Sequence, residues 1–109
     1  MIYELRTYTA APGKLDALNR RFRDVTLGLF EKHDLRVIGF WQPLAGDDQE
    51  GDLVYLLAHP DREAAEANWA VFRADEAWVR AKAESERDGP LTTKIVSRML
   101  EPTDYSPLQ

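Results

Sequence analysis

Hydrophobic and polar side chains alternate at the start of the chain, which is the period-two pattern of a β-strand. Over residues 2–8 one face carries Ile2, Glu4, Arg6 and Tyr8, and the other carries Tyr3, Leu5 and Thr7. A buried charge is costly, by roughly several kcal/mol, unless it is paired, so two opposite charges inside a strand require an explanation. We therefore regard Glu4 and Arg6 as the first candidates for a structural or functional role.

Two long segments have apolar residues three and four positions apart, the spacing that predicts amphipathic helices. The first segment covers about 13–33, and its charged residues, including Arg21, are predicted to form a solvated face. The second covers about 61–87, with Asp61 as the predicted N-cap and a predicted irregularity near 73–75. The apolar stripe of the first helix consists of Leu15, Leu18, Phe22, Val25, Leu29 and Phe30.

Three further segments, 36–43, 52–59 and 92–100, are rich in β-branched, aromatic and other apolar residues and predict strands. A polar loop bounded by glycines at 45–51 joins the first two of them as a hairpin. The residues that follow the last strand, 101–109, form a tail with two prolines and no periodicity.

The order strand, helix, strand, strand, helix, strand is that of the ferredoxin-like βαββαβ fold. We predict a single α+β domain over 1–109 with a four-stranded antiparallel sheet. The first and third strands are central in this arrangement, and the second and fourth are edges. Right-handed crossovers place both helices on one face of the sheet.

Two of the predicted strands are apolar without alternation, at 37–41 and 53–58, which is typical of strands that are buried on both faces. Two helices cover only one face of the sheet. A large exposed apolar patch is rare on a monomer, so a second copy packed sheet against sheet is the simplest cover for the other face. We therefore predict a homodimer.

Composition narrows the classes of function. The formal net charge is −5 and no cluster of Lys and Arg is present, so the sequence argues against nonspecific binding of nucleic acid. The absence of Cys excludes disulfides and thiolate chemistry. The chain passes from Met1 directly into a strand and has no apolar stretch of about 20 residues. We therefore expect no secretory signal, no membrane association and a cytoplasmic location.

Several segments together resemble the NIPSNAP family: Tyr-Glu-Leu-Arg-Thr-Tyr at 3–8, Pro-Gly-Lys-Leu at 12–15, His33, Gly-Phe-Trp at 39–41, and the ending at 102–108. The resemblance covers nearly the whole chain. It implies a dimeric α+β barrel fold, which agrees with the homodimer inferred from the strands. That superfamily also includes antibiotic-biosynthesis monooxygenases, EthD-like proteins, and haem-degrading or chlorite-dismutase-like enzymes.

The NIPSNAP family itself has no established common reaction, and its eukaryotic members are described mainly through trafficking and mitochondrial interactions. The sequence departs from the family pattern at two positions. Asp34 stands where Gly often follows the histidine, and Glu76 stands where Pro often follows the aspartate. Both positions concern a turn or a helix break, so they bear on local geometry and not on the fold.

The pair Glu4 and Arg6 has two interpretations. In the structural one, both belong to an ion-pair network at the dimer core that includes Arg98 or Lys94 of the neighbouring strand. In the functional one, Arg6 points into a cavity and holds an anionic or enolate oxygen.

The two histidines, His33 and His59, are expected to have separate roles. His33 falls at a helix C-terminus, where its cationic form complements the helix dipole. His59 ends a strand and is either a base or an ordinary surface histidine. No metal-binding spacing of histidines is present, and we expect no metal site.

The sequence is rich in aromatic residues for so small a core, and these either pack against one another or line a pocket between sheet and helices. No phosphate-binding loop and no nucleophile motif are present, and we expect no cofactor. Three functions remain: binding of a small apolar or aromatic ligand, catalysis by a cofactor-independent monooxygenase or EthD-like enzyme, and protein interaction without a small-molecule site. The candidate ligand-binding residues are Tyr3, Arg6, Tyr8, Trp41, Tyr55, His59, Trp69 and Trp78.

Overall fold

A computed structural model describes residues 1–47 and 50–109 of the chain. Four strands form one antiparallel sheet in the order β2-β3-β1-β4, so β1 and β3 are central and β2 and β4 are edges, as predicted. The hairpin loop predicted at 45–51 lies in part outside the described residues. The strands are β1 (Ile2–Ala10), β2 (Arg36–Trp41), β3 (Leu53–His59) and β4 (Thr92–Leu100).

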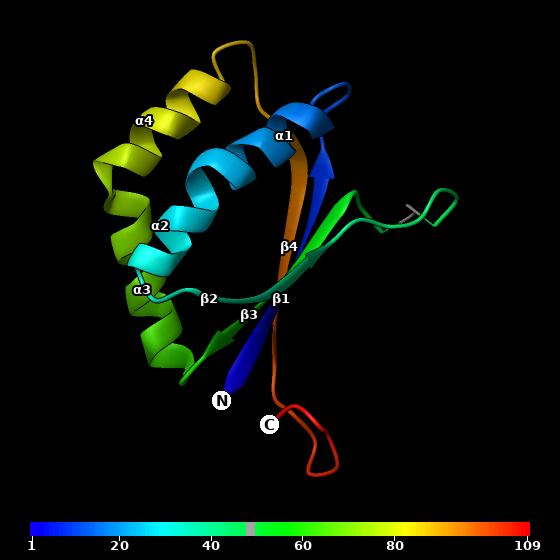
Figure 1. Cartoon of the computed structure of the whole chain (residues 1–109), viewed down its shortest axis with the longest axis vertical. Coiled ribbons are helices and arrows are strands. Elements are labelled where there is room, and N and C mark those ends of the chain that lie inside the picture. Colours follow the sequence, from blue (N-terminus) through cyan, green and yellow to red (C-terminus); the bar gives the residue numbers. More distant parts are fainter. Residues whose placement is uncertain (48–49) are drawn as a thin grey trace.

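The helices lie together on one side of the sheet, which confirms the predicted α+β arrangement (Figure 1). The predicted first helix is continuous over residues 15–32, but it contains one π-helical turn. The predicted second helix is divided into two. The helical segments are α1 (Leu15–Arg21), η1 (Phe22–Thr26), α2 (Leu27–Lys32), α3 (Arg62–Ala74) and α4 (Glu76–Ser85).

The break between α3 and α4 falls at Asp75, inside the predicted irregularity. Asp75 has an extended backbone, and its Oδ1 accepts a hydrogen bond of 2.8 Å from the Ala77 N–H, so it is the N-cap of α4. Its Oδ2 lies 2.7 Å from His33 Nε2 and 2.9 Å from Lys32 Nζ at the end of α2. His33 therefore ends a helix, as predicted, and also holds α2 against the start of α4.

Both departures from the family pattern have a local reason. Asp34 has a φ of 59°, a left-handed conformation in which Gly carries no steric penalty. Glu76 is the first residue of α4, a position where the fixed φ of Pro is favourable. With Asp and Glu at these two positions the chain still has the predicted βαββαβ fold.

The core lies between the sheet and the helices. Alternate residues of β3 point into it, and each of them is buried: Leu53, Tyr55, Leu57 and His59. Tyr8 of β1 and the rings of Phe22, Phe30, Trp69 and Phe72 complete an aromatic cluster with ring-centroid separations of 5.2–6.3 Å. Figure 1 shows these helices against the sheet.

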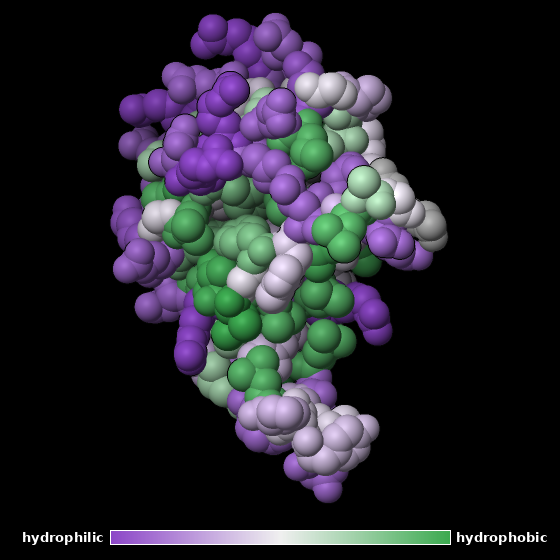
Figure 2. All heavy atoms as spheres, turned by 45° about the vertical axis from the view of Figure 1, so that its right-hand side comes forward, coloured by the Kyte–Doolittle hydropathy of each residue, from purple (hydrophilic) through white to green (hydrophobic). Residues whose placement is uncertain are grey.

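The other face of the sheet is not covered by helices. The strand register places Leu5 beside Leu56 and Arg98, and Thr7 beside Val54 and Val96, on this face. Figure 2 turns the right-hand side of Figure 1 partly forward and shows hydrophobic residues in the middle of that view, with hydrophilic residues around them. We call the uncovered face of the sheet the open face. It contains the apolar residues that led to the prediction of a homodimer, which stays a prediction.

The C-terminal tail returns to the start of β1. The hydroxyl group of Tyr3, on the open face, donates a hydrogen bond of 2.6 Å to the backbone oxygen of Gln109. None of the helices in the described part of the chain is long and apolar enough to cross a bilayer.

Candidate functional site

The carboxylate of Glu4 is the centre of a buried polar cluster on the helix-facing side of β1. The residue is only 4% exposed, yet four side chains donate hydrogen bonds to it. The donors are Trp69 Nε1 (2.8 Å) and His59 Nε2 (2.9 Å) to Oε1, and Ser97 Oγ (2.6 Å) and Arg6 Nη1 (3.0 Å) to Oε2. These donors come from α3, from β1 itself and from the two neighbouring strands, β3 and β4.

This environment keeps Glu4 ionised. Burial by itself raises the pKa of a carboxyl group, but hydrogen bonds from His59, Ser97, Trp69 and Arg6 favour the charged form more strongly. Together they bring the pKa of Glu4 down from 4.5 to about 2. The carboxylate is therefore a fixed negative charge that is fully engaged by donors.

Arg6 lies beside Glu4 and is oriented by three different acceptors. Its Nη1 bonds Glu4, its Nε donates to the Tyr55 hydroxyl (2.8 Å), and its Nη2 donates to the Tyr8 hydroxyl (3.2 Å). The guanidinium also lies 4.4 Å from the ring centroid of Trp69, a cation–π contact. Burial opposes its charge, but Tyr55, Tyr8 and Glu4 more than offset burial, so the pKa of Arg6 is raised above its ordinary value.

The two tyrosine hydroxyls that receive Arg6 are also bonded to each other, at 2.9 Å. Burial, followed by the neighbouring Tyr8, raises the pKa of Tyr55 well above its ordinary value. Tyr55 is completely buried, whereas Tyr8 forms part of a cavity wall. The pair therefore connects the interior of the core with that cavity.

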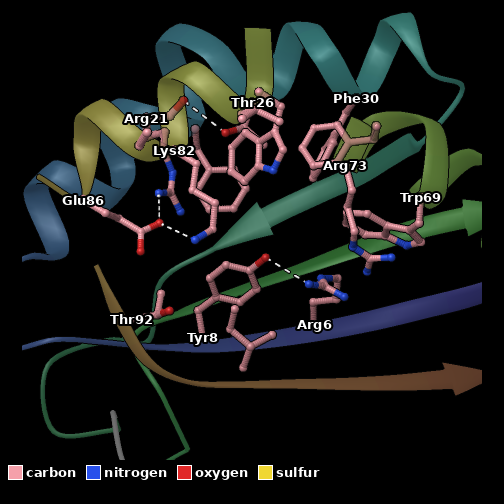
Figure 3. A pocket seen from close by; sticks show the side chains of 16 residues that line it. Arg6, Tyr8, Arg21, Thr26, Phe30, Trp69, Arg73, Lys82, Glu86 and Thr92 are labelled. Atoms are coloured by element: carbon pink, nitrogen blue, oxygen red, sulfur yellow. Dashed lines mark hydrogen bonds and ion pairs between the residues drawn. The ribbon is translucent and has the colours of Figure 1, made fainter. Parts of the chain in front are cut away.

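The cavity has a volume of about 670 Å³ and lies between the sheet and the helices (Figure 3). This is within the range of small-molecule sites, which are mostly apolar with a few convergent polar groups. Its walls combine five aromatic rings from the helices with four cationic side chains. The rings are Phe22, Phe30, Trp69, Phe72 and Trp78, and the cations are Arg6, Arg21, Arg73 and Lys82.

One end of the cavity is closed by an ion-pair cluster between the first helix and α4. Glu86 Oε2 lies 3.0 Å from both Arg21 Nη1 and Lys82 Nζ (Figure 3). Burial raises the pKa of Glu86, but hydrogen bonds from Lys82 and Arg21 outweigh burial and lower it. The prediction that Arg21 belongs to a solvated face is wrong, because its side chain is only 9% exposed and lies 5.0 Å over the Trp78 ring.

The π-helical turn shapes the same wall. Both ends of the turn, Phe22 and Thr26, are buried and line the cavity. The hydroxyl of Thr26 donates to the carbonyl oxygen of Arg21 at 3.2 Å, five residues earlier in the chain. Single π turns are frequent at functional sites.

The structure brings six of the eight predicted site residues together. Arg6, Tyr8, Trp69 and Trp78 line the cavity, and Tyr55 and His59 lie behind its wall in hydrogen bonds to Arg6 and Glu4. Tyr3 lies on the open face, and Trp41, which is 52% exposed, is placed opposite Val54 on that face too.

Two sequence-based interpretations are corrected by these contacts. His59 is not a surface residue but is fully buried, because its imidazole satisfies Glu4. The structural interpretation of Glu4 and Arg6 placed them with Arg98 or Lys94. However, the register places Arg98 opposite Leu5, which points away from the helices, and Lys94 opposite Thr9, on the same face as Leu5. Glu4 is instead satisfied by Ser97.

A second hollow of about 820 Å³ lies between α2 and the start of β2, beside Leu27 and Val37. Its charged wall residues among those that the structure describes are Glu31, Asp34 and Arg36, and all three are exposed. Convergent buried polar groups distinguish a binding site from an apolar depression, so the first cavity is the better candidate. Within residues 1–47 and 50–109 no three His, Asp or Glu side chains come together in a way that suits a metal ion.

A family model of NIPSNAP proteins matches residues 3–107. The chain belongs to the NIPSNAP family. No curated protein matches the sequence.

Solved structures with the same α+β fold include other NIPSNAP proteins. Protein Atu4242 of Agrobacterium tumefaciens is 23% identical over 100% of both chains, with a TM-score of 0.83. An uncharacterised NIPSNAP-like domain protein of Burkholderia xenovorans is 22% identical over 97% of this chain and 88% of that chain, with a TM-score of 0.81. A variant of MhuD, solved with manganese protoporphyrin IX in its active site, is 17% identical over 94% of both chains, with a TM-score of 0.62.

Proposed function

We propose that this NIPSNAP protein is a homodimer that binds a small, partly apolar molecule in the cavity between its sheet and its helices. The observation that carries the proposal is the composition of the cavity wall. Aromatic rings from four helical segments lie around a buried polar cluster in which Glu4, Tyr55 and Tyr8 already hold the guanidinium of Arg6. A site that is arranged before the ligand arrives loses little free energy in ordering itself.

Binding is favoured over catalysis by the acid–base groups of the wall. Glu86 is the one carboxylate among the described lining residues, and two cations hold it in its charged form with a lowered pKa. A general base is most effective when its pKa lies near the working pH, so Glu86 is a poor base. Tyr55 and His59, the other candidates for catalysis, lie behind the wall.

A second function is compatible with one observation. Arg6 and Tyr8 both reach the cavity, and a cofactor-independent monooxygenase or EthD-like enzyme would use such groups to polarise a phenolic or enol substrate. Consumption of a phenolic probe by the protein would be evidence for this second function.

The homodimer is supported by the open face. Val96 is 38% exposed and Trp41 is 52% exposed, and Leu5, Val54 and Leu56 are only half-buried although they occupy the middle of the sheet. A second open face would remove this apolar surface from water. Sedimentation velocity over a dilution series is the direct test, and a monomer at micromolar concentration would contradict the dimer.

The binding function is tested by blocking the cavity. Ala83 on α4 lines it, so Ala83→Phe is expected to abolish binding of an aromatic probe such as naphthalenemethanol, measured by isothermal titration calorimetry. Ala70→Phe on the exposed side of α3 is the matched control and is expected to bind as the native chain does. Equal binding of this probe to the two variants would refute the proposal, and so would a native protein that binds neither this probe nor an aromatic ligand with a charged end.

A further inference from the structure

We propose that the molecule held in this cavity is an aromatic anion, a ring carboxylate or phenolate, whose charged oxygen accepts a hydrogen bond from the hydroxyl of Tyr8. This inference rests on the binding function proposed above and adds the chemical class of the ligand and the residue that selects it. Three observations support it: the hydrogens of the tyrosine pair, the charge of the wall, and its aromatic rings.

The hydroxyl of Tyr8 has a hydrogen that no described residue accepts. Arg6 donates from Nε to the oxygen of Tyr55 and from Nη2 to the oxygen of Tyr8, and the two hydroxyls share one further hydrogen bond. The pair has two hydroxyl hydrogens for that one bond. Tyr55 is completely buried and has no other acceptor in the described chain, so its hydrogen goes to Tyr8.

The hydrogen of Tyr8 is then left for the cavity, which Tyr8 lines. Figure 3 shows Tyr8 and Arg6 adjacent to each other at the side of the cavity formed by the sheet. A phenolic hydroxyl that already accepts from a guanidinium is polarised, which strengthens the bond that it donates. An anionic oxygen is the acceptor that gains most from such a donor, because hydrogen bonds to charged groups are the stronger ones.

The charge of the wall favours an anion independently of Tyr8. Four cations line the cavity against one carboxylate, Glu86, and the neighbouring Glu4 compensates one of them. Arg73 has no ion-pair partner among the described residues and lies 5.0 Å over the ring of Trp69. Since the whole chain has a net charge of −5, this concentration of positive charge is a property of the cavity and not of the composition.

The rings define the other part of the ligand. Trp69 has two guanidiniums close to its ring, and the rings of Phe72 on α3 and Trp78 on α4 lie 4.8 Å apart in a tilted arrangement. Aromatic surfaces of this kind bind flat rings through offset and edge contacts. The combination of stacked rings with a donor at the sheet suits a flat molecule with a single charged end.

The test compares two probes that share one ring system, naphthoate and the neutral naphthalenemethanol, by calorimetry at constant ionic strength. We expect naphthoate to bind the native chain about tenfold more tightly. Tyr8→Phe, which keeps the ring but removes the donor, is expected to weaken naphthoate about tenfold and the alcohol by less than about twofold. Tyr3→Phe removes a hydroxyl from the open face and is the matched control, with neither affinity changed.

The outcomes separate the two proposals. If the native chain bound both probes with equal affinity, and Ala83→Phe bound neither, the proposal that the ligand is an anion would be wrong and the proposed binding function would stand. No binding of either probe would overturn both proposals. A preference for naphthoate that survives Tyr8→Phe would overturn the role of Tyr8.

A second variant keeps the test informative if Tyr8→Phe does not fold. Arg73 is exposed on α3, so Arg73→Gln is expected to fold and to weaken naphthoate several-fold without changing the alcohol. Unchanged affinity for naphthoate in Arg73→Gln would contradict the argument from charge.

Discussion

The substitution Glu4→Gln tests the buried carboxylate at the centre of the polar cluster. In the native chain the carboxylate of Glu4 accepts hydrogen bonds from four donors. The amide of glutamine has the same size, but its NH₂ group cannot accept hydrogen bonds from the donors that it faces. The amide is also neutral, so Arg6 loses its counter-charge. The magnitude follows from the pKa, since a change from 4.5 to about 2 corresponds to roughly 3 kcal/mol of folding free energy. We expect Glu4→Gln to lose an amount of this order at neutral pH.

The dependence on pH distinguishes this mechanism from a loss of packing. The pKa of Glu4 is lower in the folded chain than in the unfolded one, so its stabilisation is present above pH 4.5. It is lost as the pH falls toward about 2, where the folded carboxylate also takes up a proton. The native chain and Glu4→Gln should therefore converge in stability as the pH falls through this window.

Urea denaturation followed by circular dichroism measures both effects, at pH 7 and at several values below 4.5. Glu84→Gln, at an exposed position on α4, is the matched control and should leave the free energy of unfolding unchanged. A loss of less than about 1 kcal/mol in Glu4→Gln at pH 7 would refute the reasoning. If the loss of stability in Glu4→Gln does not become smaller at low pH, its cause is a change of packing and not the loss of the charge.

Two further predictions concern the sheet. Gly51 has a φ of 123°, and an added Cβ would lie 2.7 Å from Thr7 Cγ2, so Gly51→Ala is expected to destabilise the fold by about 3 kcal/mol in urea denaturation. Gly13→Ala, where φ is 75° and the space is open, should lose only about 1 kcal/mol, and equal losses would contradict the role of the close contact. Leu56→Lys on the open face is expected to give a folded monomer by sedimentation velocity, whereas Val71→Lys on the exposed side of α3 should sediment as the native chain does. A dimer that persists in Leu56→Lys would show that the open face is not the interface.

The order of the strands could be predicted from the sequence because the elements have clear boundaries and follow one another in the βαββαβ order. The face to which Glu4 and Arg6 point could not be predicted, since residues 53–58 of the neighbouring β3 are apolar on both faces. Period two assigns residues to a face but does not say which face the helices cover. The family resemblance did not resolve this either, because a match to the sequence of residues 3–8 does not say which side chains of that strand face the helices.

The contacts of the cavity wall could not be predicted from local sequence patterns either, because they join residues that are far apart in the sequence. His59 is the last residue of a strand and precedes Pro60, and nothing in that position indicates that a carboxylate 55 residues earlier will accept its hydrogen bond. Arg21 lies beside the apolar stripe, and its burial depends on the approach of α4, which the sequence places 55 residues later. The useful signal was the pair of charges in β1, because an ionised group in a central strand must be satisfied by its neighbours.

The π-helical turn at Phe22–Thr26 lets the first helix hold one residue more than a regular α-helix would hold over the same rotation. An α-helix advances about 100° per residue, so the same residues in a regular α-helix would turn α1 by an angle of this order relative to α2. Arg21 would then leave Glu86 and Trp78, while Phe30 and the other residues of α2 kept their places. A relative with one residue fewer in this turn would present the same wall from a regular α-helix. The π turn is in this respect the means by which the chain accommodates an extra residue and still keeps Arg21 at the cavity.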